Sequence, residues 1–138
     1  MRNLTISIAV EYKRSRMWGW NPTAMVTASL DDVRTDTTTG MASGGGYDKL
    51  SAAVCYAFRE NPLLQTLLLW DGWKTDTEKY GLNVVRDHEW AFDGMGMSAL
   101  LRNLWANGCH VTETRDKQGD PIAYTATRDM PASFVALV

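Results

Sequence analysis

The stretch CHVTETRDKQGDPIAYTATRD, residues 109–129, indicates how this chain folds. Two arms in which apolar and polar residues alternate flank a short polar segment that contains Gly119. Alternation with a period of two is typical of a strand with one buried face, and glycine suits the tight turn between antiparallel strands. The stretch therefore predicts a β-hairpin, in which strands that are adjacent in sequence are also adjacent in the sheet.

The N-terminal third predicts further strands of the same kind. Residues 23–32 give a second strand, with Met25 or Val26 as an apolar point, and residues 32–43 a polar, β-branched third strand near a sheet edge. We expect these two to form a hairpin that turns at Asp31 and Asp32, whereas KRSRMWGWNP, residues 13–22, breaks the alternation and predicts a loop. The first strand, residues 3–12, places four apolar side chains on one face: Leu4, Ile6, Ile8 and Val10.

Three helices and one more strand are predicted between these hairpins. A helix follows Gly46 and ends at Asn61, a short buried helix runs from Pro62 to near Gly72, and a third helix spans residues 97–107 before Gly108. Residues 79–85 predict a strand and residues 87–96 a loop that carries Trp90. The inward stripes are expected to be Leu50, Val54, Ala57 and Phe58 in the first helix, and Leu100, Leu101, Leu104 and Trp105 in the third.

Taken together, residues 1–138 predict a single α+β domain. Its sheet would be largely antiparallel, with about five to six strands built from hairpins, and two to three helices would pack on one face. The N-terminal residues alternate too regularly for a signal peptide, and no apolar run is long enough to span a membrane.

Composition argues against several classes of function. A formal net charge of −2 is too balanced for a general polyanion binder and too weak for a mimic of DNA. The two cysteines, Cys55 and Cys109, lack motif spacing and predict free thiols in a reducing cytoplasm. His88 and His110 lack the convergent partners of a metal site. We therefore expect a cytoplasmic protein with no metal, no cofactor and no disulfide.

The chain resembles a family of small uncharacterised proteins found in bacteriophages, prophages and other mobile elements. Members share an ASGxGYDK segment, a helix, and a glycine-rich entry to a second helix. The resemblance runs from about residue 23 to residue 128 and implies a genomic setting without implying a reaction. The residues that match are Ala42, Ser43, Gly44, Gly46, Tyr47, Asp48 and Lys49 in the first segment, and Gly94 and Gly96 in the second.

The three glycines Gly44, Gly45 and Gly46 form the first candidate site. Backbone N–H groups at the start of a helix suit anions, and Lys49 adds a positive charge. A phosphate loop, however, needs Lys followed by Ser or Thr directly after its last glycine, and Asp48 would occupy the helix start with an internal carboxylate. The pattern favours a structural turn over an anion site.

The segment from Lys13 to Trp20 is the preferred candidate for partner binding. It combines cations with aromatic rings: Lys13, Arg14, Arg16, Trp18 and Trp20. This composition suits a protein interface, or phosphate contacts with base stacking, or a tryptophan that closes the end of the core over solvated cations. We expect at least one of these tryptophans to be exposed.

No spacing in the chain supplies a nucleophile, a base and an orienting group together, so we expect no catalytic residues and no enzyme. A pair of Cys55 and His110 brought together by the fold stays open. The sequence favours a non-enzymatic phage or mobile-element protein that binds a host or phage protein, for example as an anti-CRISPR inhibitor does. The alternative is nucleic-acid binding through residues 13–20, and a small enzyme with an unrecognised site comes third.

Overall fold

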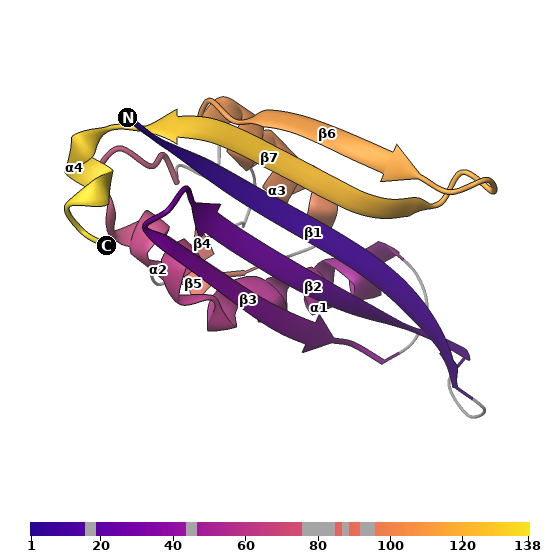
Figure 1. Ribbon diagram of the computed structural model, residues 1–138. Helices are drawn as coiled ribbons and strands as arrows, with labels where there is room; N and C mark the ends of the chain where they lie inside the picture. Colours follow the sequence, from indigo (N-terminus) through magenta and orange to yellow (C-terminus); the bar gives the residue numbers. More distant parts are fainter. Residues whose placement is uncertain (16–18, 44–46, 76–84, 87–88, 92–95) are drawn as a thin grey trace.

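The computed structural model describes residues 1–15, 19–43, 47–75, 85–86, 89–91 and 96–138 (Figure 1). For residues 12–15, 19–20, 47–48, 86 and 96 it gives the course of the backbone alone.

An antiparallel sheet of five strands, in the order β3-β2-β1-β7-β6, forms the framework. Both predicted hairpins are confirmed: one turns at Asp31, whose φ is 36°, and the other at Gly119, whose φ is 87°. The central strand β1 joins the N-terminal and C-terminal hairpins, since it pairs with β2 on one side and with β7 on the other. The strands are β1 (Arg2–Ser15), β2 (Gly19–Leu30), β3 (Arg34–Met41), β6 (His110–Arg115) and β7 (Pro121–Met130).

Three helices cover one face of this sheet, as predicted for the α+β class (Figure 1). They are α1 (Tyr47–Glu60), α2 (Pro62–Leu69) and α3 (Gly96–Ala106). A two-stranded ribbon of β4 (Val85–Arg86) and β5 (Glu89–Trp90) lies on the same side, and α4 (Ala132–Val135) sits near the N-terminus at one end of the sheet. The opposite face carries no helix in the described part of the chain.

The core lies between the sheet and the helices, where the alternating side chains of the strands meet the helical stripes. Val26, and not Met25, faces this core. Trp90, which the sequence placed in a loop, is fully buried in β5, with its ring edge-to-face on Phe58 at 5.0 Å and its Nε1 donating to the carbonyl of Leu64 at 3.2 Å. Burying both the ring and its polar edge fixes the small ribbon against α1 and α2.

The prediction that Trp105 of α3 faces the core is wrong, because its side chain is 71% exposed. The buried positions next to Leu104 are taken by Asn103 and Asn107, whose side-chain amides each donate to the backbone carbonyl of Lys74 at 3.0 Å. A hydrophobicity pattern assigns tryptophan to the core before asparagine. Here the segment around Lys74 offers a buried carbonyl that needs donors, and the asparagines face it.

The prediction of a loop at residues 13–22 is also wrong. Strands β1 and β2 stay paired through Ser15 opposite Gly19, so most of this segment is a hydrogen-bonded ribbon. Strand pairing uses backbone groups alone, and therefore continues after the apolar alternation stops at Val10.

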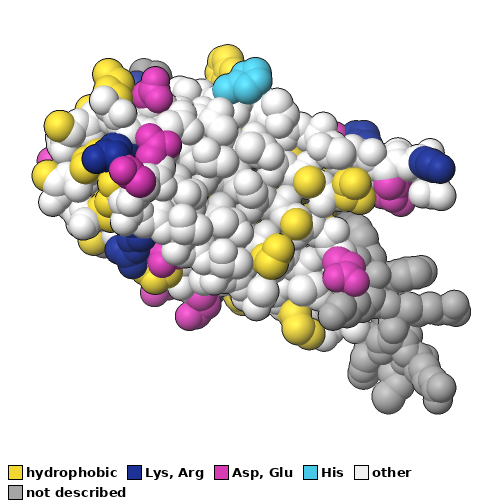
Figure 2. Space-filling model, viewed as in Figure 1, with side chains coloured by type: hydrophobic (Ala, Val, Ile, Leu, Met, Phe, Trp, Pro, Cys, Tyr) yellow, Lys and Arg dark blue, Asp and Glu magenta, His cyan; other side chains and the backbone are white. Residues whose placement is uncertain are grey.

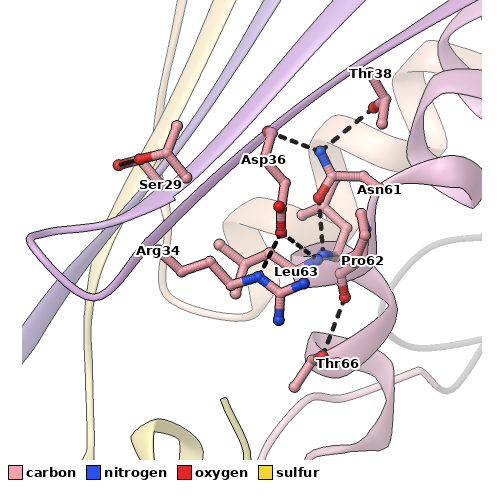
Figure 3. A network of polar contacts seen from close by, with 10 residues as sticks. Ser29, Arg34, Asp36, Thr38, Asn61, Pro62, Leu63 and Thr66 are labelled. Atoms are coloured by element: carbon pink, nitrogen blue, oxygen red, sulfur yellow. Dashed lines mark hydrogen bonds and ion pairs between the residues drawn. The ribbon is translucent and has the colours of Figure 1, made fainter.

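Asn61 joins three elements at the corner between α1 and α2 (Figure 3). Its Oδ1 accepts from the backbone N–H of Leu64 at 3.2 Å and caps α2, while its Nδ2 donates to the carbonyl of Asp36 at 3.0 Å and to Thr38 Oγ1 at 3.3 Å, both on β3. Asp36 completes the link, since its Oδ2 accepts from the N–H of Leu63 at 3.1 Å. Asn61 is fully buried, so removing one of these polar groups would leave its buried partners without a hydrogen bond.

We predict that Asn61→Ala lowers the free energy of unfolding by about 3 kcal/mol, because it removes a helix cap and leaves buried donors and acceptors unpaired. Asn61→Ser is the matched control. Its hydroxyl still caps α2 but is too short to reach β3, so it should lose about 1 kcal/mol less. Urea unfolding measures both values, and equal losses for the two variants would contradict the bridging role.

Gly40 marks the closest approach of α1 to the sheet. A Cβ atom at this position would lie 2.1 Å from the carbonyl oxygen of Ala53 and 2.7 Å from the nitrogen of Ala57, both backbone atoms of α1. Backbone atoms of a packed helix move only with the whole helix. The absence of a side chain at Gly40 therefore sets the spacing of the two layers.

Gly40→Ala should lower the free energy of unfolding by about 3 kcal/mol through overpacking. Gly119→Ala is the control, since nothing lies within 4 Å of a Cβ there and only the positive φ is strained; a loss of about 1 kcal/mol is expected for it. Denaturant midpoints compare the two. A smaller loss at Gly40 than at Gly119 would show that the layers adjust freely.

Candidate functional site

The backbone of β1 and β2 continues beyond the rest of the sheet as a two-stranded arm, residues 12–15 and 19–22 (Figure 1). Pairing of β7 with β1 reaches Ala9, and pairing of β3 with β2 reaches Thr23, so among the described residues no strand pairs with the arm, and the N–H of Ala42 donates to the carbonyl of Pro22 at its base at 3.2 Å. Lys13 pairs with Asn21 and Arg14 with Trp20 in this arm. The structure thus brings three of the predicted partner-binding residues into one ribbon, while Arg16 and Trp18 lie outside the described residues.

Lys49 lies at an open cavity of about 350 Å³ between the start of α1 and the ends of β2 and β3. Ser43 and Tyr56 supply hydroxyl groups to its lining, and Met41 and Ala52 supply apolar surface. One cation with two hydroxyls suits a small anion weakly. The other members of the predicted anion site, Gly44, Gly45 and Gly46, lie outside the described residues.

The open face of the sheet is a candidate that the sequence analysis missed. Outward side chains on all five strands fall into register and form transverse rows. The first row is Thr35, Ser29, Thr5, Thr127 and His110, the second is Thr37, Thr27, Ser7, Thr125 and Thr112, and the third is Thr39, Met25, Ala9, Ala123 and Thr114. We call these three rows the hydroxyl face, because Thr and Ser hold most of their positions.

Neighbouring hydroxyls on this face bond to one another across strands. Thr27 Oγ1 and Thr37 Oγ1 are 3.1 Å apart, and Ser29 Oγ and Thr35 Oγ1 are 2.9 Å apart. A hydroxyl both donates and accepts, so each of these groups keeps further capacity toward solvent or a partner.

Charged side chains avoid the hydroxyl face. None of its three rows contains Lys, Arg, Asp or Glu, and His110 at the edge is their one titratable side chain. Figure 2 shows this distribution: basic and acidic side chains gather at the two ends of the view, and the middle is neutral. A line of hydrophobic side chains also crosses the face, consistent with Met25, Ala9 and Ala123 standing side by side on β2, β1 and β7.

The fold does not bring Cys55 and His110 together as a pair. Cys55 is buried on α1, where its thiol donates to the carbonyl of Trp90 at 3.2 Å, whereas His110 is exposed on the hydroxyl face. The two side chains thus lie on opposite sides of the sheet. Within the described ranges, no three His, Cys, Asp or Glu side chains come together as metal ligands.

Arg128 on β7 contacts the backbone at the end of α3. Its Nη1 donates to the carbonyl of Asn107, which satisfies the helix terminus, and its guanidinium lies 5.5 Å from the ring centroid of Trp70. A cation at the carboxyl end of a helix and over an aromatic face is stabilising in both respects. These contacts account for Arg128 as a structural residue.

No protein-family model, curated protein or solved structure matches this chain. Among the described residues, every helix is too short or too polar to span a lipid bilayer. The proposals below therefore rest on the residues and the geometry of the chain itself.

Cys109, the neighbour of His110, points into the core, and burial raises the pKa of its thiol to about 11, although the positive charge of Arg128 acts in the opposite direction. In the unfolded chain this thiol titrates near its ordinary value of 9.0. Between these two values the unfolded chain has released a proton that the folded protein still holds, so stability is lost as the pH rises through this window.

We predict that this residue contributes a loss on the order of 1–2 kcal/mol in the free energy of unfolding between pH 8 and pH 10.5. Urea unfolding of the wild type and of Cys109→Ala at both pH values isolates the contribution, since the tyrosines and lysines are common to both proteins. Equal pH dependence in the two proteins would contradict it.

Proposed function

We propose that this chain is a non-enzymatic phage or mobile-element protein that binds a protein of the host or phage in the cytoplasm, as an inhibitor of a host defence system does. The observation that carries the proposal is the arm, because β1 and β2 continue there as a two-stranded ribbon with which no other described strand pairs. The sequence from Lys13 to Trp20 holds two tryptophans and three cations: Trp18, Trp20, Lys13, Arg14 and Arg16.

A projecting ribbon is well suited to capture a partner. Two strands alone are marginally stable in water, so the arm gains order from a surface that covers it. Trp and Arg are the residue types that dominate binding free energy at protein interfaces. The arm therefore combines a position away from the core with the composition of an interaction hot spot.

Binding of nucleic acid by the same arm is the second candidate. Its support is the same set of cations interleaved with aromatic rings, which fits phosphate contacts and base stacking. A protein partner is favoured because the chain is acidic overall, with a formal net charge of −2, and because the hydroxyl face beside the arm offers no cation to extend a phosphate track.

The test is capture from host lysate by immobilised protein, with and without nuclease, followed by affinity measurement on the captured partner. Trp20→Ala should weaken binding by about 2 kcal/mol, roughly 30-fold, while leaving stability within about 1 kcal/mol. Trp105→Ala is the control, since Trp105 is an exposed tryptophan on α3, away from the arm. Loss of binding with Trp105→Ala and not with Trp20→Ala would contradict the arm as the site.

Charge reversal separates the two candidate partners. Arg14→Glu combined with Arg16→Glu should slow association with a protein and leave a shallow salt dependence. With nucleic acid the affinity should fall steeply with salt, and nuclease should abolish capture. Lys117→Glu is the control, because Lys117 is an exposed cation in the turn between β6 and β7. An equal effect of this control would mean that net charge, and not the arm, controls binding.

A further inference from the structure

The hydroxyl face is too uniform to be ordinary solvated surface. Exposed sheet faces usually mix Lys, Glu, Arg and Thr, yet three consecutive rows across five strands hold no acidic or basic side chain other than His110. Depletion of charge is the compositional mark of the centre of a protein interface. The question is which partner such a surface fits.

The chemistry of the face excludes most classes of partner. Nucleic acid requires cations, and these rows hold none. Single-stranded bases need aromatic side chains to stack on, and these rows hold no Phe, Tyr or Trp. A strongly charged protein would find no complementary charge there.

We propose that the hydroxyl face is the interface of a two-fold symmetric dimer of this chain. In such a dimer the residues near the two-fold axis meet their own copies, so a charge there would lie near a like charge from the partner copy. A face without charges avoids this repulsion. Hydroxyl groups are self-complementary as well, because each one donates and accepts, and the methyl group of threonine adds apolar contact.

The size of the face agrees with a stable dimer. Five strands at a spacing of about 4.8 Å, and three rows that repeat every two residues, about 6.8 Å along a strand, cover on the order of 500 Å² in projection. The side chains that stand on this plane raise the accessible area toward the roughly 800 Å² per partner of a standard interface. Two sheets packed face to face at about 10 Å bury such a surface in one layer.

The centre of the face can be located from the strand registers. β1 is the middle strand of five, and Ser7 lies in the middle row, so the two-fold axis of a dimer that buries the whole face passes close to Ser7. The adjacent row places Met25, Ala9 and Ala123 together, and Met25 is 47% exposed. Next to the axis, this apolar strip supplies the desolvated contact that neutral hydroxyls alone do not give.

This dimer goes beyond the proposed function, and neither proposal depends on the other. The arm continues past the ends of β3 and β7, outside the three rows, so it stays available to another partner when the hydroxyl face is covered.

Sedimentation velocity of the purified protein over a range of concentrations is the test. The wild type should sediment as a species of twice the 15.4 kDa chain mass. Ser7→Arg and Ser7→Glu should each be monomeric, because like charges meet at the axis. Mixed in equal amounts, they should restore the dimer, since opposite charges then face each other.

Ser98→Arg and Ser98→Glu are the matched controls, because Ser98 is exposed on α3 in the helical layer, and both should remain dimeric. Thr37→Arg, on the exposed edge strand β3, repeats the test at a position more tolerant of a long side chain, and far-UV circular dichroism establishes that each variant is folded. Trp20→Ala should leave the dimer intact, which separates this result from that of the proposed function.

Three outcomes would overturn the proposal: a wild type that is monomeric at every concentration, a dimer that both Ser7 variants retain, or a mixture of the two Ser7 variants that stays monomeric. A wild type that becomes dimeric only when a captured partner is added would assign the face to that partner.

Discussion

The pairing of β1 with strands from both ends of the chain is the constraint on which the structure depends. β1 pairs with β2 from Leu4 to Ser15 and with β7 from Arg2 to Ala9, and this second ladder joins residues more than a hundred positions apart. The two hairpins thereby become one sheet. α1, α2 and α3 all lie on the same side of this sheet, so the other face carries no helix from the described residues.

Both edges of this sheet are protected, which directs association toward its open face. On β3, Asp36 is bonded to the corner of α1 and α2, since its carbonyl accepts from Asn61 Nδ2 and its Oδ2 accepts from the N–H of Leu63. On β6, Glu113 and Arg115 form an ion pair at 2.5 Å, and the register shifts between Thr114 and Arg115. Charges and irregular register are the usual defences of an edge strand against a further strand.

The sequence predicted the fold class because the relevant signals are local. Alternation, helical stripes and turn residues such as Asp31 and Gly119 each act within a few positions, and antiparallel hairpins turn local signals directly into topology. The errors arose where a distant partner decided the outcome. Trp90 is buried because its ring packs on Phe58 and its Nε1 donates to the carbonyl of Leu64. Trp105 is exposed because the neighbouring Asn103 and Asn107 face inward, where their amides donate to the carbonyl of Lys74.

The same distinction explains the candidate sites. Lys13, Arg14 and Trp20 could be singled out because they are adjacent in sequence. The hydroxyl face could not, because its rows cross five strands and need the registers, even though every strand carries a readable Ser/Thr-x-Ser/Thr pair: Thr5 and Ser7, Thr27 and Ser29, Thr35 and Thr37, Thr112 and Thr114, and Thr125 and Thr127. The backbone of Lys13, Arg14 and Trp20 thus lies in the arm beyond the sheet, whereas neutral hydroxyls lie on a broad and regular face. Trp and Arg are the residue types that dominate binding free energy at protein interfaces, whereas a neutral face can meet its own copy without repulsion between like charges.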